Sequence, residues 1–506
     1  MNQNIKALID SKISDLTCIE AKNKKPLTYA KLLNQANYTN TVLSKVGIKK
    51  NGRVAVVLDN GPAMASLFIS VASCACIAPL NPAYKKEEFR FYLTDIGADC
   101  LILEKGAKSP AYEVANELRI PILQVDTKSA DVAGKFEFQD YDIESECQPG
   151  VFSESEDLAL ILHTSGTTSK PKLVPLTNKN LITSAKNISE TLKLSSNDKC
   201  LNIMPLFHIH GLIAAILASV SAGGSIYCTE GFSALNFFSE LDNSDASWYT
   251  AVPTMHQAIL SRAKRNSHII DKIRLRFIRS SSASLPPQIM KELESIFSCP
   301  IIEAYGMTEA SHQMASNPLG KNTQKPGTVG LSAGPEVAIL EENGSNFLST
   351  DEIGEIVIKG GNVFRGYENN PEANKKSFMD NWFRTGDQGF IDEEGFITIS
   401  GRLKEIINRG GEKISPREVD EVLMDHPNVE QVVTFSIPHD KLGEEIAAAI
   451  VLNQQGTTSE EELKTYAASK LSDFKVPRKI IFLEEIPKGA TGKLQRIGLS
   501  EKLGLN

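Results

Sequence analysis

Short apolar runs alternate with segments of helical periodicity, and this alternation constrains the fold more than any other feature. The first series predicts a helix at residues 27–46, then strands at 53–58, 77–80, 100–103 and 121–125 separated by helices at 63–76, 87–96 and 111–118. A second series predicts strands at 248–252, 275–279 and 300–304, with helices at 254–264 and 286–297. Strands that alternate with helices are joined by right-handed crossovers into a largely parallel sheet. The chain is therefore predicted to be an α/β protein with two βα-type units.

The pattern changes after Glu336. Short runs broken by glycine and asparagine, such as 355–359 and 395–399, predict an antiparallel or barrel-like piece, and a small α+β unit follows Gly401. At 506 residues the chain is too long for a single core. We expect a large N-terminal domain, residues 1–403, of two βα-type subdomains and a small β-barrel-like subdomain. A small α+β C-terminal domain, residues 404–506, completes the chain.

The composition, with 41% hydrophobic and 23% charged residues, is typical of a globular enzyme. Because the net charge is −8, a general nucleic-acid binder is disfavoured, and an anionic ligand must be met by local positive charge. Eight scattered cysteines without a C-x-x-C pair favour reduced thiols over disulfides or a zinc site. The sequence has no apolar signal core, no run of membrane-spanning length and no peroxisomal tripeptide at its end, so a cytoplasmic location is expected.

A stretch rich in hydroxyl groups follows the apolar run 158–162 and precedes a helix expected at 180–192, with Thr177 or Asn178 as its N-cap. It contains Thr164, Ser165, Gly166, Thr167, Thr168, Ser169, Lys170 and Lys172. Hydroxyls, main-chain N–H groups and two lysines suit phosphate oxygens, and the glycine permits close approach. The spacing is not that of a Walker A loop. From these residues alone, a phosphate-binding loop and a solvated Ser/Thr turn both remain open.

Two further stretches carry groups that suit a nucleotide. At the end of the strand expected at 300–304, Tyr305 could stack on a purine, Thr308 could bind a phosphate oxygen and Glu309 could hold Mg²⁺. Asp387 ends another apolar run, where a carboxylate can accept from ribose hydroxyls. Each signal is weak alone, because strand ends are often ordinary turns.

The last two stretches, 401–413 and 487–496, are rich in glycine and basic residues. In this order the five stretches resemble the adenylate-forming superfamily of acyl-CoA synthetases, luciferases and peptide-synthetase adenylation domains. The resemblance covers nearly the whole chain. Segments 205–211, 279–284, 307–312 and 407–416 look most like those of the oxalate–CoA ligase family.

The resemblance implies a two-step reaction with ATP, Mg²⁺ and coenzyme A. A carboxylate attacks the α-phosphate of ATP and releases pyrophosphate, and the thiol of coenzyme A then displaces AMP from the acyl-AMP. It implies a small C-terminal domain that moves between the two half-reactions. The expected partners are these small molecules, with no membrane, no nucleic acid, and a monomer or homodimer.

The resemblance also implies roles for particular residues. ATP and AMP would be contacted by Thr164, Ser165, Gly166, Thr167, Thr168, Lys172, Ser282, Ala283, Ser284, Glu303, Ala304, Tyr305, Asp387 and Arg402. Catalysis would involve Thr308, Glu309 as the Mg²⁺ ligand, His208 and Lys493. Lys404 would be the hinge, and Gly410 and Gly411 would line the coenzyme A tunnel. The acid would be bound by His210, Ser281 and His312.

Two histidines and a serine suit a short acid with a second polar end, and oxalate fits because its second carboxylate needs a partner when desolvated. Several alternatives remain: a ligase for an aromatic, malonate-like or medium-chain acid, an enzyme that loads a carrier protein, and a non-catalytic nucleotide-binding protein. A metal site at His208 and His210 is also open, because alternate residues of a strand share a face.

Overall fold

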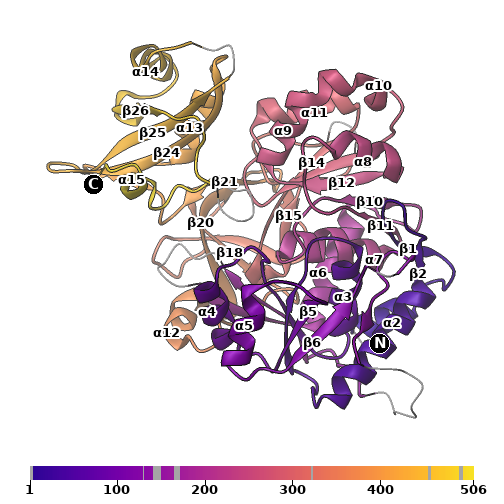
Figure 1. Cartoon of the computed structure of the whole chain (residues 1–506). Coiled ribbons are helices and arrows are strands. Elements are labelled where there is room, and N and C mark those ends of the chain that lie inside the picture. Colours follow the sequence, from indigo (N-terminus) through magenta and orange to yellow (C-terminus); the bar gives the residue numbers. More distant parts are fainter. Residues whose placement is uncertain are drawn as a thin grey trace.

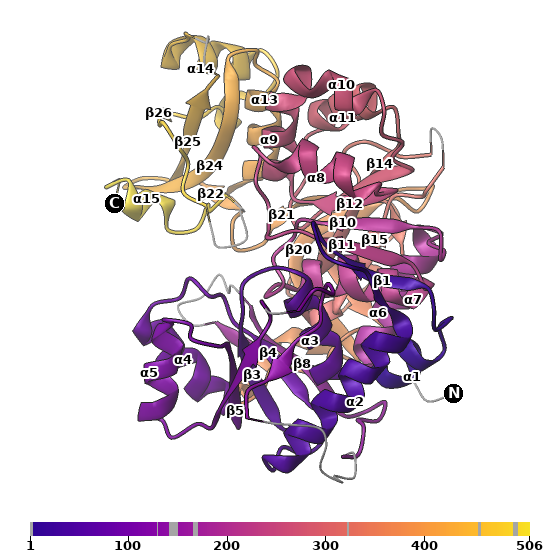
Figure 2. The ribbon, with the colours of Figure 1, turned by 45° about the vertical axis from the view of Figure 1, so that its right-hand side comes forward.

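The computed structural model describes residues 4–128, 130–140, 150–164, 171–320, 323–453, 457–488 and 494–505. Within these ranges the strands form two large sheets of seven and nine strands and two smaller sheets of five strands each. Figures 1 and 2 show the small C-terminal part at the same end of the molecule as helices α9 (Pro253–Ala263) and α11 (Pro287–Phe297). The predicted α/β class, with a large N-terminal part and a small C-terminal α+β part, is confirmed.

The seven-stranded sheet has the order β7-β6-β5-β3-β4-β8-β9. Its strands β3 to β6 and β8 pair in parallel, and β7 and β9 add antiparallel edges. The strands are β3 (Arg53–Val57), β4 (Cys76–Pro79), β5 (Cys100–Glu104), β6 (Ile122–Asp126), β7 (Glu137–Phe138), β8 (Leu158–Thr164) and β9 (Lys172–Thr177).

The nine-stranded sheet has the order β16-β15-β14-β13-β12-β10-β11-β1-β2. Its strands are β1 (Thr17–Glu20), β2 (Leu27–Thr28), β10 (Lys199–Asn202), β11 (Ser225–Cys228), β12 (Trp248–Ala251), β13 (Phe277–Ser281), β14 (Ile301–Met307), β15 (His312–Ser316) and β16 (Leu331–Ser332). The chain begins in this second sheet, because β1 pairs in parallel with β11. The two βα-type units are thus interleaved in sequence.

Helices packed between the two large sheets join them into one core. Helix α3 (Pro62–Ala72) contains no charged residue and contacts both β8 and β1, as expected for a helix that is apolar on all sides. Helix α6 (Asn178–Thr191) contacts β8 and β15, and its N-cap is Thr177, which forms a capping box with Asn180. The remaining helices of the large part are α1 (Ile5–Asp10), α2 (Tyr29–Lys45), α4 (Lys86–Ile96), α5 (Pro110–Glu117), α7 (Ala218–Ala222), α8 (Phe237–Ser244), α10 (Ser267–Ile270), α12 (Pro371–Ser377), a π-helix at His210–Leu217, and 3₁₀ turns at Lys264–Asn266 and Thr308–Ala310.

The third sheet is antiparallel and contains β17 (Glu336–Leu340), β18 (Gly354–Lys359), β19 (Phe378–Met379), β20 (Trp382–Ile391) and β21 (Ile397–Arg402). The fourth contains β22 (Ile407–Arg409), β23 (Glu412–Ile414), β24 (Val429–His439), β25 (Gly443–Leu452) and β26 (Lys479–Phe482). It packs with α13 (Pro416–Met424), α14 (Glu460–Ala468), a 3₁₀ turn at Asp473–Lys475 and α15 (Leu499–Lys502). The chain passes from the third to the fourth sheet between Arg402 and Ile407.

One local prediction was wrong, and one open alternative lost its structural basis. Strand β14 continues to Met307, so Tyr305 lies within the strand and not in the turn after it. His208 lies outside any strand and His210 begins the π-helix, so the shared strand face on which the metal alternative depended does not exist. No group of three or more His, Cys, Asp or Glu side chains in the described ranges could hold a metal ion.

Candidate active site

The predicted adenine and acid residues are neighbours because β13 and β14 run in parallel. Ser281 is opposite Ala304, and its hydroxyl donates to the carbonyl oxygen of Ala304 at 2.7 Å. In the same register, the Glu303 carboxylate accepts from the backbone N–H of Leu285 at 2.9 Å. This bond ties the loop of Ser282, Ala283 and Ser284 to β14. Burial raises the pKa of Glu303 to about 7.

Tyr305, Asp387 and Arg402 form one hydrogen-bonded network. Asp387 and Arg402 are opposite each other on β20 and β21, and the Arg402 Nε donates to Asp387 Oδ1 at 2.9 Å. The other carboxylate oxygen of Asp387 accepts from the Tyr305 hydroxyl. The charge of Asp387 raises the pKa of Arg402. The predicted ribose and adenine residues are therefore held together before any ligand is bound.

Glu309 lies beside a second network, which brings together distant parts of the chain. Its Oε1 accepts from the Tyr367 hydroxyl at 2.7 Å, and the Lys172 ammonium lies 4.3 Å from the centre of the Tyr367 ring. Burial raises the pKa of Glu309, and the charges of Arg402 and Lys172 oppose that rise. Burial and the charge of Lys404 lower the pKa of Lys172. A carboxylate and three cationic side chains thus converge near one place.

The surroundings of Glu309 fit Mg²⁺ only if the phosphates of the nucleotide supply most of the ligands of the ion. Within the described ranges Glu309 belongs to no cluster of three metal-binding side chains. Mg²⁺ is commonly held by one or two carboxylates together with substrate phosphates and water. A single buried carboxylate next to Lys172 and Arg402 matches that arrangement, because the cations can bind the remaining phosphate oxygens.

A cluster of polar side chains surrounds His210 at the start of the π-helix. Its Nε2 is 2.6 Å from Thr250 Oγ1, and its Nδ1 is 3.0 Å from Ser282 Oγ. The ring of His312 lies 4.9 Å from the ring of His210, centre to centre. π-Helical turns occur frequently at functional sites. The two histidines predicted to bind the acid are therefore in contact. We call His210, His312, Thr250 and Ser282 the histidine cluster.

The adjacent residues Ser281 and Ser282 have different partners. The Ser281 side chain is fully buried, and its hydroxyl is bound to Ala304. Ser282 has a φ of 76°, and this left-handed backbone turns its hydroxyl toward His210. No local pattern predicts this turn, since serine has no strong preference for positive φ. The structure thus places Ser282, and not Ser281, in the histidine cluster.

The remaining predicted residues lie in several places. Thr164 and Lys172 are opposite each other on β8 and β9, at the two ends of the hydroxyl-rich stretch. Thr308 begins the 3₁₀ turn that contains Glu309, and His208 Nδ1 accepts from the N–H of His210. Gly410 and Gly411, with φ of 61° and 98°, make the turn between β22 and β23. Ser165, Gly166, Thr167, Thr168 and Lys493 lie outside the described residues.

The small C-terminal part is attached through the residues around Lys404. Helix α13 contacts β21, and the Arg417 Nη1 donates to the carbonyl oxygen of Ile399 at 2.6 Å. Arg496 Nη2 lies 2.9 Å from Asp420 on α13, and its Nε lies 3.1 Å from Glu405, directly after Lys404. The segment that follows Lys493 is thereby tied to the segment that connects the two parts.

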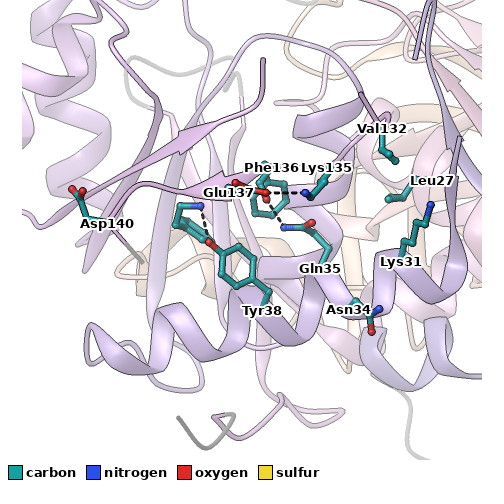
Figure 3. A pocket seen from close by; sticks show the side chains of 11 residues that line it. Leu27, Lys31, Asn34, Gln35, Tyr38, Val132, Lys135, Phe136, Glu137 and Asp140 are labelled. Carbon is teal, nitrogen blue, oxygen red and sulfur yellow. Dashed lines mark hydrogen bonds and ion pairs between the residues drawn. The ribbon is translucent and has the colours of Figure 1, made fainter. Parts of the chain in front are cut away.

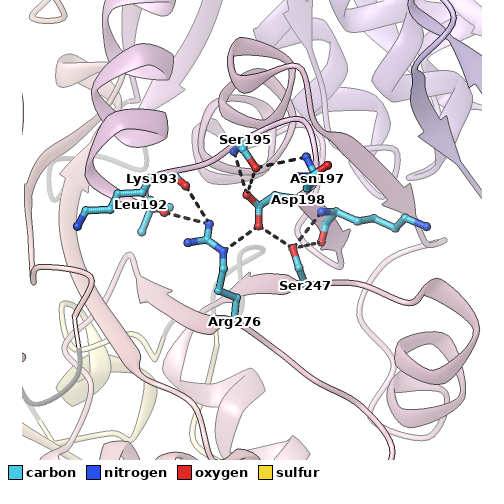
Figure 4. A network of polar contacts seen from close by, with 8 residues as sticks. Leu192, Lys193, Ser195, Asn197, Asp198, Ser247 and Arg276 are labelled. Carbon is cyan, nitrogen blue, oxygen red and sulfur yellow. Dashed lines mark hydrogen bonds and ion pairs between the residues drawn. The ribbon is translucent and has the colours of Figure 1, made fainter.

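Two other features lie away from this site. A cavity of about 890 Å³ is lined by α2 and residues 132–140, where Gln35 donates to the Phe136 carbonyl and Tyr38 accepts from the Phe138 N–H (Figure 3). None of the predicted site residues lines this cavity. Figure 4 shows Asp198 bound to Arg276, Ser195 and Ser247. Asp198 directly precedes β10, and Ser247 directly precedes β12. The network therefore lies at the amino ends of these strands, and the candidate active site lies at their opposite, carboxyl ends.

Sequence reasoning missed three residues near the site: Tyr367, Thr250 and Arg279. Tyr367 and Thr250 belong to no segment singled out in the sequence. Arg279 begins the segment 279–284, but no role was predicted for it. Tyr367 approaches Lys172 because the Glu368 N–H donates to the carbonyl oxygen of Leu173. Thr250 and Arg279 are opposite each other on β12 and β13.

Comparison with known proteins agrees with this geometry. Residues 7–368 match the family described as AMP-binding enzyme, and residues 418–493 match the AMP-binding enzyme C-terminal domain. An oxalate–CoA ligase of Arabidopsis thaliana is 42% identical over 493 residues, which cover 96% of each chain. An oxalate–CoA ligase of Saccharomyces cerevisiae is 41% identical, with 88% of this chain and 86% of that protein covered. The crystal structure of ATP-bound MatB from Rhodopseudomonas palustris superposes with a TM-score of 0.90 at 27% identity, covering 99% of both chains.

Proposed function

This chain belongs to the AMP-binding enzyme family, and we propose that it is an ATP-dependent oxalate–CoA ligase. The reaction converts oxalate, ATP and coenzyme A to oxalyl-CoA, AMP and pyrophosphate. The observation that carries this proposal is the histidine cluster beside the Glu309 and Asp387 networks. It offers imidazole and hydroxyl groups to a short polar acid near the residues that suit a nucleotide.

In the first half-reaction one carboxylate oxygen of oxalate attacks the α-phosphorus of ATP, and the bond to pyrophosphate breaks. Lys172 neutralises phosphate charge. Asp387 accepts hydrogen bonds from the ribose hydroxyls, and its carboxylate is held in place by Arg402 and Tyr305. Glu309 would hold Mg²⁺, which neutralises phosphate charge and orients the leaving group. The resemblance to the family assigns Lys493 to the oxygen atoms of the reacting carboxylate and the α-phosphate.

In the second half-reaction the sulfur of coenzyme A attacks the acyl carbon, and AMP leaves with the electrons of the carbon–oxygen bond. The small domain must move to admit the thiol. We assign residues 1–403 and 404–506 to the two domains, with Lys404 as the hinge, because the chain changes sheets between Arg402 and Ile407. Gly410 and Gly411 fit a tunnel for the thiol arm, since neither presents a side chain.

The proposal extends to the cellular location of the enzyme and to its binding partners. No helix in the described ranges is both long and apolar enough to cross a membrane. The described cysteines are buried free thiols, which suits a reducing compartment such as the cytoplasm. Small molecules are then the partners, and either a monomer or a homodimer is compatible with the site.

Replacement of His312 tests the acid-binding site. His312→Ala should raise the KM for oxalate at least about tenfold and change the KM for ATP less than about twofold, because it removes a ring that lies against His210 in the histidine cluster. His268→Ala is the matched control, since His268 lies on the peripheral helix α10 and should change neither constant. Steady-state AMP release gives both values. An unchanged dependence on oxalate would remove His312 from the acid site.

A second candidate is a ligase for another short dicarboxylic acid. The histidine cluster supports this candidate as well, because its imidazole and hydroxyl groups suit any short acid with a second polar end. Oxalate is favoured because two relatives that are 42% and 41% identical to this chain are oxalate–CoA ligases.

A further inference from the structure

Arg279 is a fully buried arginine without a paired carboxylate. It lies on β13, and its side chain has no exposed surface. No Asp or Glu of the described ranges forms an ion pair with it. Arg276, three residues earlier, is instead bound to Asp198 at 2.8 Å (Figure 4). Since buried charges are normally paired, the uncompensated charge of Arg279 calls for an explanation.

The contacts of Arg279 lead to the histidine cluster. Its Nη1 donates to Thr250 Oγ1 at 3.5 Å and its Nη2 to Gln313 Oε1 at 3.4 Å, so both partners are neutral. Burial lowers the pKa of Arg279 to about 9, and the guanidinium therefore stays protonated at neutral pH. Thr250 is also the partner of His210, and it stands between the buried charge and the imidazole.

Arginine can only donate hydrogen bonds, so Thr250 Oγ1 accepts from Arg279. The Thr250 hydroxyl keeps one hydrogen and a second lone pair, so it can either donate to His210 Nε2 or accept from it. When Thr250 donates, a neutral His210 carries its proton on Nδ1 and donates it to Ser282 Oγ. The Ser282 hydroxyl hydrogen is then left to donate to a ligand.

We infer that Arg279 is a specificity-determining positioning residue: through Thr250 it orients His210 and Ser282, and its buried charge selects an acid with a second negative group. The inference rests on the proposed function and deepens it. In a site of low dielectric constant, an uncompensated cation favours a dianion over a monoanion of the same shape. Oxalate is such a dianion. Arg279 touches no substrate, so it acts through Thr250 and through its field.

Oxalate and oxamate provide the test, because oxamate has nearly the same shape and one negative charge fewer. We expect the wild-type enzyme to prefer oxalate to oxamate at least about tenfold in kcat/KM. Thr250→Val, which keeps the shape but removes the hydroxyl, should reduce that preference about tenfold, and Thr250→Ser should restore it. Arg279→Met should reduce the preference for oxalate over oxamate as strongly as Thr250→Val. None of these variants should change the KM for ATP more than about twofold.

Arg276→Met is the matched control, because it removes an arginine next to the same strand that is already paired with Asp198. It should lower thermal stability and leave the preference for oxalate intact. Calorimetric titration of oxalate and oxamate into the enzyme with a non-hydrolysable ATP analogue compares the two acids without turnover. Wild-type enzyme that binds both acids equally would overturn the inference together with oxalate specificity. A wild-type preference that Thr250→Val and Arg279→Met leave within about twofold would overturn the inference alone.

Discussion

Glu309 and Tyr367 show how a single contact can tune the pKa of a buried carboxyl group. The Glu309 carboxyl is buried, which raises its pKa, and the hydrogen bond from Tyr367 lowers that pKa again. The ammonium of Lys172 lies over the face of the same tyrosine ring. Tyr367 thus holds both a carboxylate suited to Mg²⁺ and a lysine suited to phosphate, without itself touching either ligand.

Replacement of Tyr367 should therefore change the pH dependence of the enzyme. Only the ionised carboxylate of Glu309 holds Mg²⁺, so activity falls as the pH drops through its pKa. Tyr367→Phe removes the bond that lowers this pKa, and we expect the acidic limb of kcat/KM for ATP to move upward by about 0.5 to 1 pH unit. The measurement is a pH series of AMP formation at saturating oxalate.

Tyr112→Phe serves as the control, because the Tyr112 side chain is exposed on the surface helix α5. Its pH profile should match that of the wild type. A limb that moves to lower pH in Tyr367→Phe, or that does not move, contradicts the role assigned to this tyrosine.

At the scale of elements, the connection from β14 to β15 places the histidine cluster. The register of the two strands shifts between Tyr305 and Gly306, and His312 opens β15 with a φ of 97°. A β-carbon added to Gly306 would lie 1.9 Å from the carbonyl oxygen of His312. This close approach needs glycine, because the contact is with backbone and cannot be relieved by a change of rotamer.

Gly306→Ala should consequently displace His312 and destabilise the fold. We expect a loss of about 3 kcal/mol or more in the free energy of unfolding, measured by urea denaturation, with a large rise in the KM for oxalate. Gly361→Ala is the control, since an added β-carbon there would lie 3.5 Å from the Thr183 side chain, an ordinary contact. If Gly306→Ala is as stable and active as Gly361→Ala, the close approach does not determine the position of His312.

Element types followed from local patterns, whereas pairings and fine placement did not. The alternation of apolar runs was enough for most of the parallel strands, but β1, β10 and β11 were not predicted. Thr177 was recognisable as a helix cap, and its hydroxyl accepts a bond from within the next turn. The pairing of β1 with β11 joins residues about 200 positions apart, and no local pattern specifies such a partner. Two further features depend on tertiary contacts: the extension of β14 beyond its predicted end at residue 304, and the turn of Ser282 toward His210. Motif resemblance supplied most of the candidate site residues. It did not point to Tyr367 or Thr250, and it included Arg279 in the segment 279–284 without assigning it a role.

At the scale of the whole molecule, the site lies where all the large parts of the chain meet. Lys172 comes from the seven-stranded sheet, Glu309 from the turn after β14, Arg402 from the end of the third sheet, and Lys404 from the connection to the small domain. The electrostatic influence of Lys404 on Lys172 links that connection to the phosphate side of the site. Movement of the small domain about Lys404 would therefore change the charge around the nucleotide between the two half-reactions.

The most direct test of the central claim is AMP formation with oxalate, malonate, coumarate and octanoate, measured side by side in the presence of ATP, Mg²⁺ and coenzyme A. We predict a kcat/KM for oxalate at least about tenfold above that of each other acid, with formation of AMP that requires coenzyme A for full turnover. A higher value for malonate, coumarate or octanoate, or no AMP from any of the four, would contradict the assignment of this chain as an oxalate–CoA ligase.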